Sequence, residues 1–250
     1  MTTLAILTAA GSGTRLGRDM PKALVEVHGL PMVLHAARRL AASGVVDSLV
    51  VTAPVGLATV MSDVVTRDPQ VTVPVRVVDG GATRQESVAA GLALAGPGDD
   101  VVLVHDAARP FASPALVRRV VAAVRGGHGA VVPGVPVVDT IKSVSVAVDS
   151  RPAGVFGDDA AVEPVTSTPD RSVLRAVQTP QGFDRSLLER AHAAGASRAA
   201  DAHATDDAGL VEALGETVVV VPGEDAALKI TTERDLVLAT FYADGSGDRP

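Results

Sequence analysis

Short apolar segments that read as strands alternate with amphipathic segments that read as helices along this chain, and this alternation limits the possible folds more than any other feature. The expected strands are residues 3–8, 48–53, 73–78, 101–105, 130–132, 173–178 and 217–221. The expected helices are residues 32–42, 57–65, 83–94, 114–125, 185–194, 206–214 and 232–242. Regular βαβ alternation predicts a Rossmann-like α/β fold, a mostly parallel sheet with helices on both faces that binds ligands at the carboxyl ends of its strands.

Two of these helices carry start signals in the sequence. Thr83 and Glu86 have the spacing of a capping box, in which each side chain bonds the backbone of the other residue. Ser113 precedes Pro114, which combines a capping hydroxyl with proline in the first turn. Both signals predict helices that begin immediately after the capping residue.

One interval, residues 136–171, interrupts the alternation. It is rich in Val, Ser, Thr, Pro and Asp, has no helical period, and contains an acidic stretch at residues 157–159. We expect a β-arm that protrudes from a single domain spanning residues 1–250. Residues 245–250 are expected to form a disordered tail.

The composition excludes several classes of protein. The chain has 250 residues, a formal net charge of −7 and no cysteine. The net negative charge argues against nucleic acid as a partner, and the absence of cysteine excludes disulfides and thiolate chemistry. No apolar run approaches the length of a membrane span, and residues 1–10 lack a basic leader, so we expect no membrane association and a cytoplasmic location.

A glycine-rich loop follows the first expected strand and is the first candidate site. Residues 9–17 read AAGSGTRLG and are followed by Pro21 and Lys22. Glycines let backbone N–H groups surround phosphate oxygens, and Arg15 and Lys22 add positive charge, so the loop is a candidate triphosphate site. The second strand ends Thr-Ala-Pro without the acidic residue of dinucleotide-binding folds, and no Walker A sequence is present. A simple βα turn with incidental basic residues remains an alternative.

Three further segments place charged or polar side chains beside apolar strands. Asp106 stands at the carboxyl end of an expected central strand, where a carboxylate can hold Mg²⁺ directly or through water. The alternative is a surface ion pair with Arg109, which would contribute little energy. Residues 139–142 (DTIK) and 228–231 (LKIT) each contain a lysine among apolar residues, which is either a ligand-binding group or a solvated side chain.

Taken together, these segments resemble the 2-C-methyl-D-erythritol 4-phosphate cytidylyltransferases of the non-mevalonate isoprenoid pathway. The matching text, in order along nearly the whole chain, is AAGSGTRLG…PK at 9–22, DGG…R…SV at 79–88, VLVHDAARP at 102–110, DTIK at 139–142, DR at 170–171, TPQGF at 179–183, TDD at 205–207 and LKIT at 228–231. Sugar nucleotidyltransferases share single motifs of this set, whereas HDAARP, TPQ and the late Lys-Ile-Thr in this order are more specific.

The resemblance implies an enzyme that uses CTP and Mg²⁺, and it assigns roles to residues of this chain. The CTP contacts are Ala9, Ala10, Gly11, Gly13, Gly81 and Ser87. The catalytic cations are Arg15 and Lys22 at the triphosphate, with Arg171 and Lys229 at the sugar phosphate. The acceptor side is completed by Asp106, which also serves the metal, and by Arg109, Thr140 and Thr179. The arm at 136–171 is expected to pair two subunits in a homodimer.

The chain departs from the pattern of this family at two places. Ala82 and Thr83 stand where we would expect an acidic residue after Gly81, and the arm between Thr140 and Arg171 is longer than usual.

In the implied reaction, a phosphate oxygen of the acceptor attacks the α-phosphorus of CTP, so the nucleophile is already an anion and needs no strong base. Catalysis would therefore come from positioning and from cations. Two alternatives remain at this point, a cytidylyltransferase for another polyol phosphate such as ribitol 5-phosphate and a non-catalytic nucleotide-binding regulator.

Overall fold

The computed structural model describes residues 1–11, 13, 20–145, 163–196 and 205–243, and these form two compact units. One unit comprises Met1–Gly134 and Val177–Pro250, and the other comprises Val135–Ala176. Arg15, the acidic stretch 157–159 and the expected tail 245–250 lie outside the described residues.

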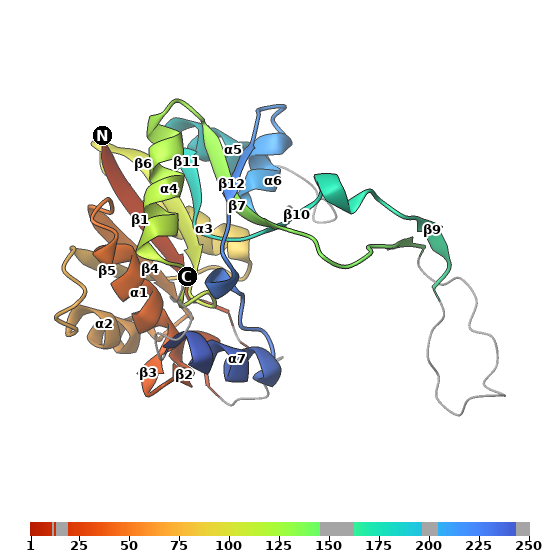
Figure 1. The fold of residues 1–250 in the computed structure, drawn as a ribbon. Helices are drawn as coiled ribbons and strands as arrows, with labels where there is room; N and C mark the ends of the chain where they lie inside the picture. Colours follow the sequence, from red (N-terminus) through yellow and green to blue (C-terminus); the bar gives the residue numbers. More distant parts are fainter. Residues whose placement is uncertain (12, 14–19, 146–162, 197–204, 244–250) are drawn as a thin grey trace. The chain divides into compact units, whose positions relative to one another are not determined.

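The larger unit is built on a mostly parallel sheet (Figure 1). Within the described residues eight strands join it, in the order β10-β7-β11-β6-β1-β4-β5, with β12 pairing beside β7. Their bounds are β1 (Thr2–Thr8), β4 (Ser48–Ala53), β5 (Val75–Asp79), β6 (Asp99–Asp106), β7 (Ala130–Pro136), β10 (Arg175–Val177), β11 (Gln181–Asp184) and β12 (Val219–Pro222). Strand β1 pairs in parallel with β4 and β6, so their carboxyl ends meet at one edge.

Helices cover both faces of this sheet, as the strand–helix alternation predicts. They are α1 (Met32–Ala42), α2 (Ala58–Thr66), α3 (Arg84–Leu92), α4 (Pro114–Arg125), α5 (Arg185–Ala196) and α6 (Asp207–Glu212). The chain also forms a β2–β3 hairpin (Glu26–Val27 and Leu30–Pro31), 3-10 turns at Lys22–Leu24 and Asp225–Ala227, and helix α7 (Glu233–Ala243). None of the described helices is long and apolar enough to cross a membrane.

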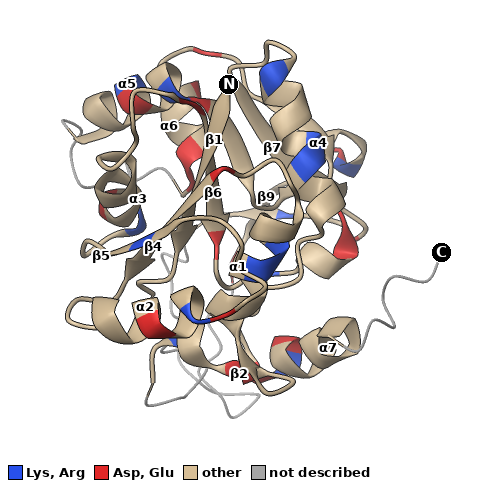
Figure 2. Ribbon diagram, turned by 90° about the vertical axis from the view of Figure 1, so that its left-hand side faces the viewer, with Lys and Arg blue, Asp and Glu red and all other residues tan. Residues whose placement is uncertain are grey.

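The side chains of β1 show why the sheet needs two layers of helices. Ala5 and Leu7 belong to the core cluster under α1, α2 and α4, whereas Leu4 and Ile6 belong to the cluster under α3, α5 and α6. Successive strand residues point to opposite faces, so a strand that is apolar at every position must be covered on both sides. The outer surfaces carry charge, with basic residues on α1 and α4 and acidic residues on α2 and β2 (Figure 2).

The two helix-start signals are confirmed. The side chain of Thr83 accepts a hydrogen bond from the backbone N–H of Glu86 and the Glu86 carboxylate accepts one from the backbone N–H of Thr83, so α3 begins with a complete capping box. The hydroxyl of Ser113 accepts a hydrogen bond from the backbone N–H of Leu116, and α4 begins at Pro114. Both capping side chains accept hydrogen bonds from backbone N–H groups that the first helical turn leaves without partners.

The strand prediction at 173–178 is wrong in detail, and the strand that follows it was missed. The expected strand at 173–178 is a 3-10 turn at Arg171–Val173 followed by the shorter strand β10. Strand β11, which was not predicted, lies between β6 and β7 and is antiparallel to both. Its four residues have neither alternation nor β-branched side chains, so their pairing depends on the strands on each side and not on local propensity.

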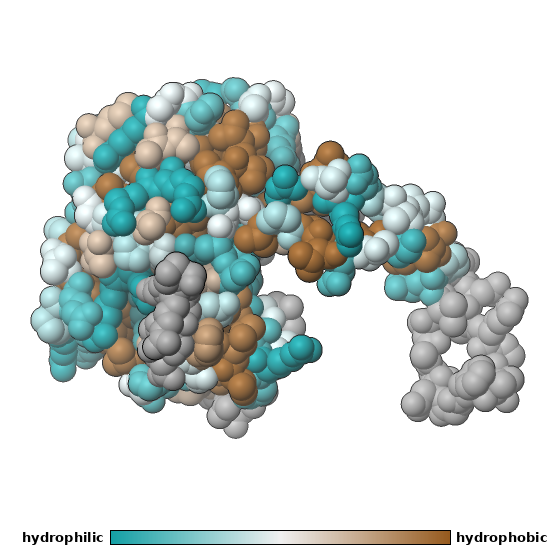
Figure 3. Space-filling model, in the orientation of Figure 1, coloured by the Kyte–Doolittle hydropathy of each residue, from teal (hydrophilic) through white to brown (hydrophobic). Residues whose placement is uncertain are grey.

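The smaller unit, residues 135–176, contains no α-helix in its described part. Strands β8 (Ser143–Val144) and β9 (Val165–Ser167) pair there as an antiparallel ribbon. Several apolar side chains of this unit are exposed, among them Val138, Val144, Val165 and Val173, and hydrophobic residues are visible on its surface in Figure 3.

Candidate functional site

A cavity of about 450 Å³ opens at the carboxyl ends of β1 and β6. It is lined by the loop after β1, the turn before α3, the end of β6 and the segment around residue 229. The lining residues are Thr8, Ala9, Ala10, Gly11, Gly13, Lys22, Ala23, Gly81, Ala82, Thr83, Arg84, Ser87, Asp106, Ala107, Ala108, Lys229 and Thr231. A smaller cavity of about 220 Å³ shares Arg84, Asp106 and Lys229 with it and is also lined by Arg109 and Thr179.

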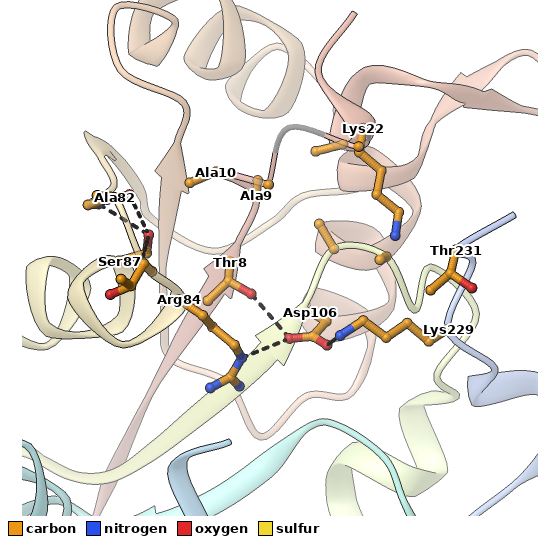
Figure 4. A pocket seen from close by; sticks show the side chains of 17 residues that line it. Thr8, Ala9, Ala10, Lys22, Ala82, Arg84, Ser87, Asp106, Lys229 and Thr231 are labelled. Carbon is orange, nitrogen blue, oxygen red and sulfur yellow. Dashed lines mark hydrogen bonds and ion pairs between the residues drawn. The ribbon is translucent and has the colours of Figure 1, made fainter. Parts of the chain in front are cut away.

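The glycine-rich loop brings Lys22 to this cavity. Gly13 has a φ of +71°, and a Cβ built on it would lie 2.6 Å from the Cβ of Lys22. Only glycine accepts both that backbone conformation and that close approach without strain. Lys22 opens the 3-10 turn that follows Pro21, and its side chain points into the cavity (Figure 4).

The turn before α3 packs directly on the first loop. A Cβ on Gly80 would lie 2.7 Å from the Cβ of Ala10, so the two loops are in contact at this glycine. The hydroxyl of Ser87 accepts a hydrogen bond from the N–H of Gly81 at 3.1 Å and donates one to the carbonyl of Thr83 at 2.9 Å. Ser87 therefore fixes the shape of its own turn, which leaves the backbone of Gly81 and Ala82 at the cavity wall.

The carboxylate of Asp106 lies at the centre of the site. Its Oδ2 is 2.7 Å from Nζ of Lys229, and its Oδ1 is 3.5 Å from Nε of Arg84. The hydroxyl of Thr8 lies 3.3 Å from the same Oδ1 (Figure 4) and 3.2 Å from the carbonyl of His105, and it shares its proton between these two acceptors. Two cations from residues far apart in the chain thus meet at one buried carboxylate.

These cations decide the ionisation of Asp106. Burial alone would raise its pKa, because a desolvated carboxylate favours the neutral form, but the charges of Lys229 and Arg84 act in the opposite direction and outweigh burial. The pKa of Asp106 is therefore held well below its ordinary value, and the group is a carboxylate throughout the physiological pH range.

Lys229 is held by its flanking residues. Ala227 and Ile230 are fully buried, and the N–H of Ile230 donates to the carbonyl of Ala108 at 2.8 Å. Arg109 donates from Nη1 to the carbonyl of Ala227 at 2.7 Å, so the residue predicted on the acceptor side fastens the segment that carries Lys229. The lysine side chain itself remains 40% exposed.

Glu224 fastens the same segment from the other side. Its carboxylate accepts hydrogen bonds from the backbone N–H and, at 2.7 Å, from the hydroxyl of Ser113, the capping residue of α4. Gln178 exchanges two hydrogen bonds with the backbone of Glu224, at 2.8 and 3.1 Å. The backbone that leads to Lys229 is therefore tied both to α4 and to the chain before β11.

Thr179 lies behind Asp106 in a buried chain of hydrogen bonds. Its hydroxyl accepts from the N–H of Asp106 at 3.0 Å and contacts Nδ1 of His105 at 2.9 Å. Nε2 of His105 faces the carbonyl of Arg109 at 3.2 Å, which can only accept, so this nitrogen carries the proton. Burial lowers the pKa of His105 to about 4, and the neutral ring therefore accepts the Thr179 proton at Nδ1.

The donor atoms of the cavity suit a magnesium ion that is shared with a substrate. Asp106 is the single carboxylate among the described residues that line the larger cavity, and no group of three or more His, Asp or Glu in the described part of the chain could hold a metal. Mg²⁺ is usually bound through one or two carboxylates together with substrate phosphates, not in a closed protein cage. One ionised carboxylate fits that mode of binding.

The structure brings together most, but not all, of the residues that the sequence indicates. Those at the two cavities are Ala9, Ala10, Gly11, Gly13, Lys22, Gly81, Ser87, Asp106, Arg109, Thr179 and Lys229. Arg15 lies outside the described residues. Thr140 and Arg171 belong to the smaller unit, where Arg171 donates to the carbonyl of Val138, two residues before Thr140.

Sequence reasoning missed Arg84 as a site residue. It is the first residue of α3 and contacts Asp106. The capping box at Thr83 was a usable signal, because it fixes Arg84 in the first turn of a helix that starts at the carboxyl end of a strand.

Comparison with known proteins gives one consistent result. The sequence model of a family described as 2-C-methyl-D-erythritol 4-phosphate cytidylyltransferase matches residues 3–244. A protein of that name from Nocardia farcinica is 51% identical over 241 residues, which cover 96% of this chain and 94% of the relative. Another from Streptomyces avermitilis is 49% identical over 238 residues, covering 95% and 90%.

Solved structures show the same likeness. The crystal structure of 2-C-methyl-D-erythritol 4-phosphate cytidylyltransferase from Thermus thermophilus is similar with a TM-score of 0.70 at 37% identity, covering 96% of this chain and 98% of that one. A 4-diphosphocytidyl-2C-methyl-D-erythritol synthase from Anaerococcus prevotii reaches a TM-score of 0.78 at 29% identity, covering 97% and 98%.

The buried hydroxyl of Thr179 gives a prediction for stability. Replacing Thr179 with Val keeps the shape but leaves the Asp106 N–H and His105 Nδ1 without partners, at a cost of about 1–3 kcal/mol for each unsatisfied group. Urea unfolding of Thr179→Val should show this loss in the free energy of unfolding, whereas Thr179→Ser, which keeps the hydroxyl, should remain close to wild type. A Val variant as stable as wild type would show that the chain of hydrogen bonds contributes nothing.

Proposed function

Because this chain belongs to the 2-C-methyl-D-erythritol 4-phosphate cytidylyltransferase family, we propose that the cavity at the ends of β1 and β6 is where its reaction takes place. The chain is a nucleotidyltransferase that transfers CMP from CTP to 2-C-methyl-D-erythritol 4-phosphate and releases pyrophosphate. Family membership favours this acceptor over ribitol 5-phosphate, and catalysis over a non-catalytic regulator. The observation that carries the location is the Asp106 carboxylate with Lys229 and Arg84 beside it in a cavity also lined by Lys22.

The glycine-rich loop and the turn before α3 form the nucleotide side of the proposed site. Backbone N–H groups around Gly11 and Gly13 surround the triphosphate, and Lys22 and Arg15 neutralise it. The base lies toward Gly81 and Ala82, whose backbone is held at the cavity wall by Ser87. Since Ala82 and Thr83 offer no carboxylate, recognition of the base at this turn uses backbone groups.

The reaction is an in-line displacement at the α-phosphorus. An oxygen of the acceptor phosphate forms a bond to the α-phosphorus while the bond from that phosphorus to the oxygen bridging to the β-phosphate breaks. The electron pair leaves with pyrophosphate, and no proton transfer is required. Two polyanions must approach each other, so the cations of the site supply most of the catalysis by stabilising the crowded transition state.

Lys229 has a particular place in this proposal. In the free protein its ammonium group pairs with Asp106 at 2.7 Å, which keeps it at the cavity wall. An incoming acceptor phosphate competes for the ammonium group, and Asp106 then becomes available to other ligands. Asp106 would be the residue that holds a magnesium ion, which would supply further positive charge to the reacting phosphates.

We also propose that the chain acts as a homodimer in which residues 136–171 contribute Thr140 and Arg171 to the site of the partner subunit. The ribbon of β8 and β9 has only two short strands, and such a ribbon is marginally stable alone in water. Val138, Val165 and Val173 are 78%, 58% and 75% exposed in the single chain. Contact with a second copy would bury these side chains and stabilise the ribbon.

Pyrophosphate release tests the assigned reaction. The purified protein should release pyrophosphate with CTP and 2-C-methyl-D-erythritol 4-phosphate, and much more slowly with ATP, GTP or UTP, or with ribitol 5-phosphate as acceptor. Addition of EDTA should abolish release, and excess Mg²⁺ should restore it. Equal rates with ribitol 5-phosphate would contradict the acceptor assignment, and release that persists in EDTA would contradict the role of the divalent ion.

Subunit mixing tests the shared site. Lys22→Ala and Arg171→Ala should each be inactive alone, but in a mixed dimer one site carries both changes and the other carries neither. Random exchange makes about half of the dimers mixed, so recovery should approach about one quarter of wild-type activity. A mixture that stays inactive after exchange has been demonstrated, for example by native mass spectrometry, would show that Arg171 serves its own chain.

A further inference from the structure

Arg84 joins two carboxylates that lie in different surroundings. Its Nε is 3.5 Å from Oδ1 of Asp106 at the cavity, and its Nη1 donates to Oδ2 of Asp207 at 2.6 Å. Arg84 is the first residue of α3, whereas Asp207 is the first residue of α6. The planar guanidinium group presents several donors in a fixed fork, so one arginine can hold two carboxylates in a defined geometry.

Asp207 has no contact with the cavity that holds Asp106. Its side chain is completely buried, and it lines neither of the two cavities described above. Its Oδ1 accepts a hydrogen bond from Nε2 of His192 on α5 at 2.9 Å, and the His192 side chain is 6% exposed. Nδ1 of His192 has no hydrogen-bond partner in the described part of the chain, so the polar contact of this ring is directed to Asp207 alone.

Lys229 and Arg84, the two cations beside Asp106, therefore differ in how freely their side chains can move. Lys229 reaches Asp106 through a flexible chain, is 40% exposed and, within the described residues, makes this one ion pair. Arg84 is 28% exposed and is anchored at its far side by a carboxylate that is itself buried. A phosphate entering the cavity can draw Lys229 away, whereas moving Arg84 would leave the buried charge of Asp207 without its partner, which is strongly unfavourable.

We propose that Arg84 is a positioning residue that keeps the Asp106 carboxylate in place when Lys229 transfers to a substrate phosphate, and that Asp207 and His192 hold Arg84 for this task. The inference rests on the function proposed above for Asp106 and Lys229. The turn that carries Gly81 and Ala82 is held separately, by the hydroxyl of Ser87 and the capping box at Thr83. Loss of the Asp207 anchor should therefore affect Asp106 and leave the nucleotide side of the site in place.

The charges around Arg84 agree with this arrangement. Burial lowers the pKa of its guanidinium group, but Asp207 and Asp106 more than offset that effect, and the pKa is raised overall. Arg84 is therefore a permanent cation, in keeping with a fixed partner for Asp106 and not with a proton donor.

The first test separates turnover from nucleotide binding. Asp207→Asn keeps the shape but removes the buried charge that anchors Arg84, and loss of such an outer partner typically costs about 10- to 100-fold in activity. We expect kcat to fall by that factor, while the Kd of CTP, measured by calorimetry in EDTA, changes by less than about threefold. Arg84→Lys, which keeps the charge but cannot span both carboxylates, should behave in the same way.

The matched control is Asp68→Asn. Asp68 pairs with Arg38 through two hydrogen bonds, at 3.1 and 2.5 Å, away from both cavities. Its loss should lower the free energy of unfolding and leave kcat unchanged. If Asp207→Asn also retains wild-type kcat, or if Arg84→Lys weakens CTP binding without lowering kcat, the positioning role is refuted.

A double variant tests whether Asp207 acts through Arg84. If it does, Arg84→Lys combined with Asp207→Asn should be no slower than Arg84→Lys alone, because the second change removes an anchor that the first has already made ineffective. If the losses in kcat of the two single variants multiply in the double variant, the two residues act independently, and the inference is overturned. Should Asp207→Asn not fold, Arg84→Lys alone decides the matter, since a wild-type kcat would exclude any positioning role.

A further variant distinguishes failure of this inference from failure of the proposed function. Lys229→Ala should reduce kcat whether or not Arg84 is a positioning residue. A normal kcat for Lys229→Ala would remove the proposed function and the inference with it. A slow Lys229→Ala beside normal Arg84→Lys and Asp207→Asn variants would remove the inference alone.

Discussion

The buried carboxylate of Asp106 is the constraint on which the site depends. A carboxylate with almost no access to water is costly unless cations and hydrogen bonds compensate it. Lys229, Arg84 and the Thr8 hydroxyl provide that compensation from three parts of the chain, and Thr179 satisfies the backbone N–H of the same residue. Removal of any one of these groups alters the balance for the others, so the segments that carry them must be held together.

The fold meets this requirement at the carboxyl ends of two adjacent strands. Parallel pairing of β1 with β6 places Thr8 opposite Asp106, so the hydroxyl and the carboxylate are neighbours by register. The loop after β1 also needs small residues where it meets the turn after β5, as the close contact of Gly80 with Ala10 shows. The segment of Lys229 has no strand of its own at this edge and is tied on by Arg109, Gln178 and Glu224.

The sequence predicts much of this arrangement because the relevant signals are local. Each signal extends over only about ten residues of sequence. The alternation of strands and helices predicts the α/β sheet, and the capping box at Thr83 and the glycine loop before Lys22 indicate the edge of the sheet where the cavity lies. The placement of Asp106 at a strand end follows from the same pattern.

Other features depend on contacts between distant segments and have no local signal. Arg84 and Asp207 are separated by 123 positions, and neither residue by itself indicates the ion pair that they form. Strand β11 is defined by its antiparallel pairing with β6 and β7 and not by its own four residues. The sequence thus indicates Lys22 and Lys229 individually, whereas the contact of Arg84 with Asp106 and the way in which the cations are held become visible only in three dimensions.

The central claim is that the charge of Asp106 organises the cations of this site for phosphoryl transfer, and the most direct measurement is kcat of Asp106→Asn at saturating CTP, acceptor and Mg²⁺. The amide keeps the shape of the side chain, so the far-UV circular dichroism spectrum should remain that of the wild type. The account predicts a loss in kcat of about 10²–10³, the size expected when one preorganised electrostatic group is removed. A folded Asp106→Asn protein with unchanged kcat would contradict it.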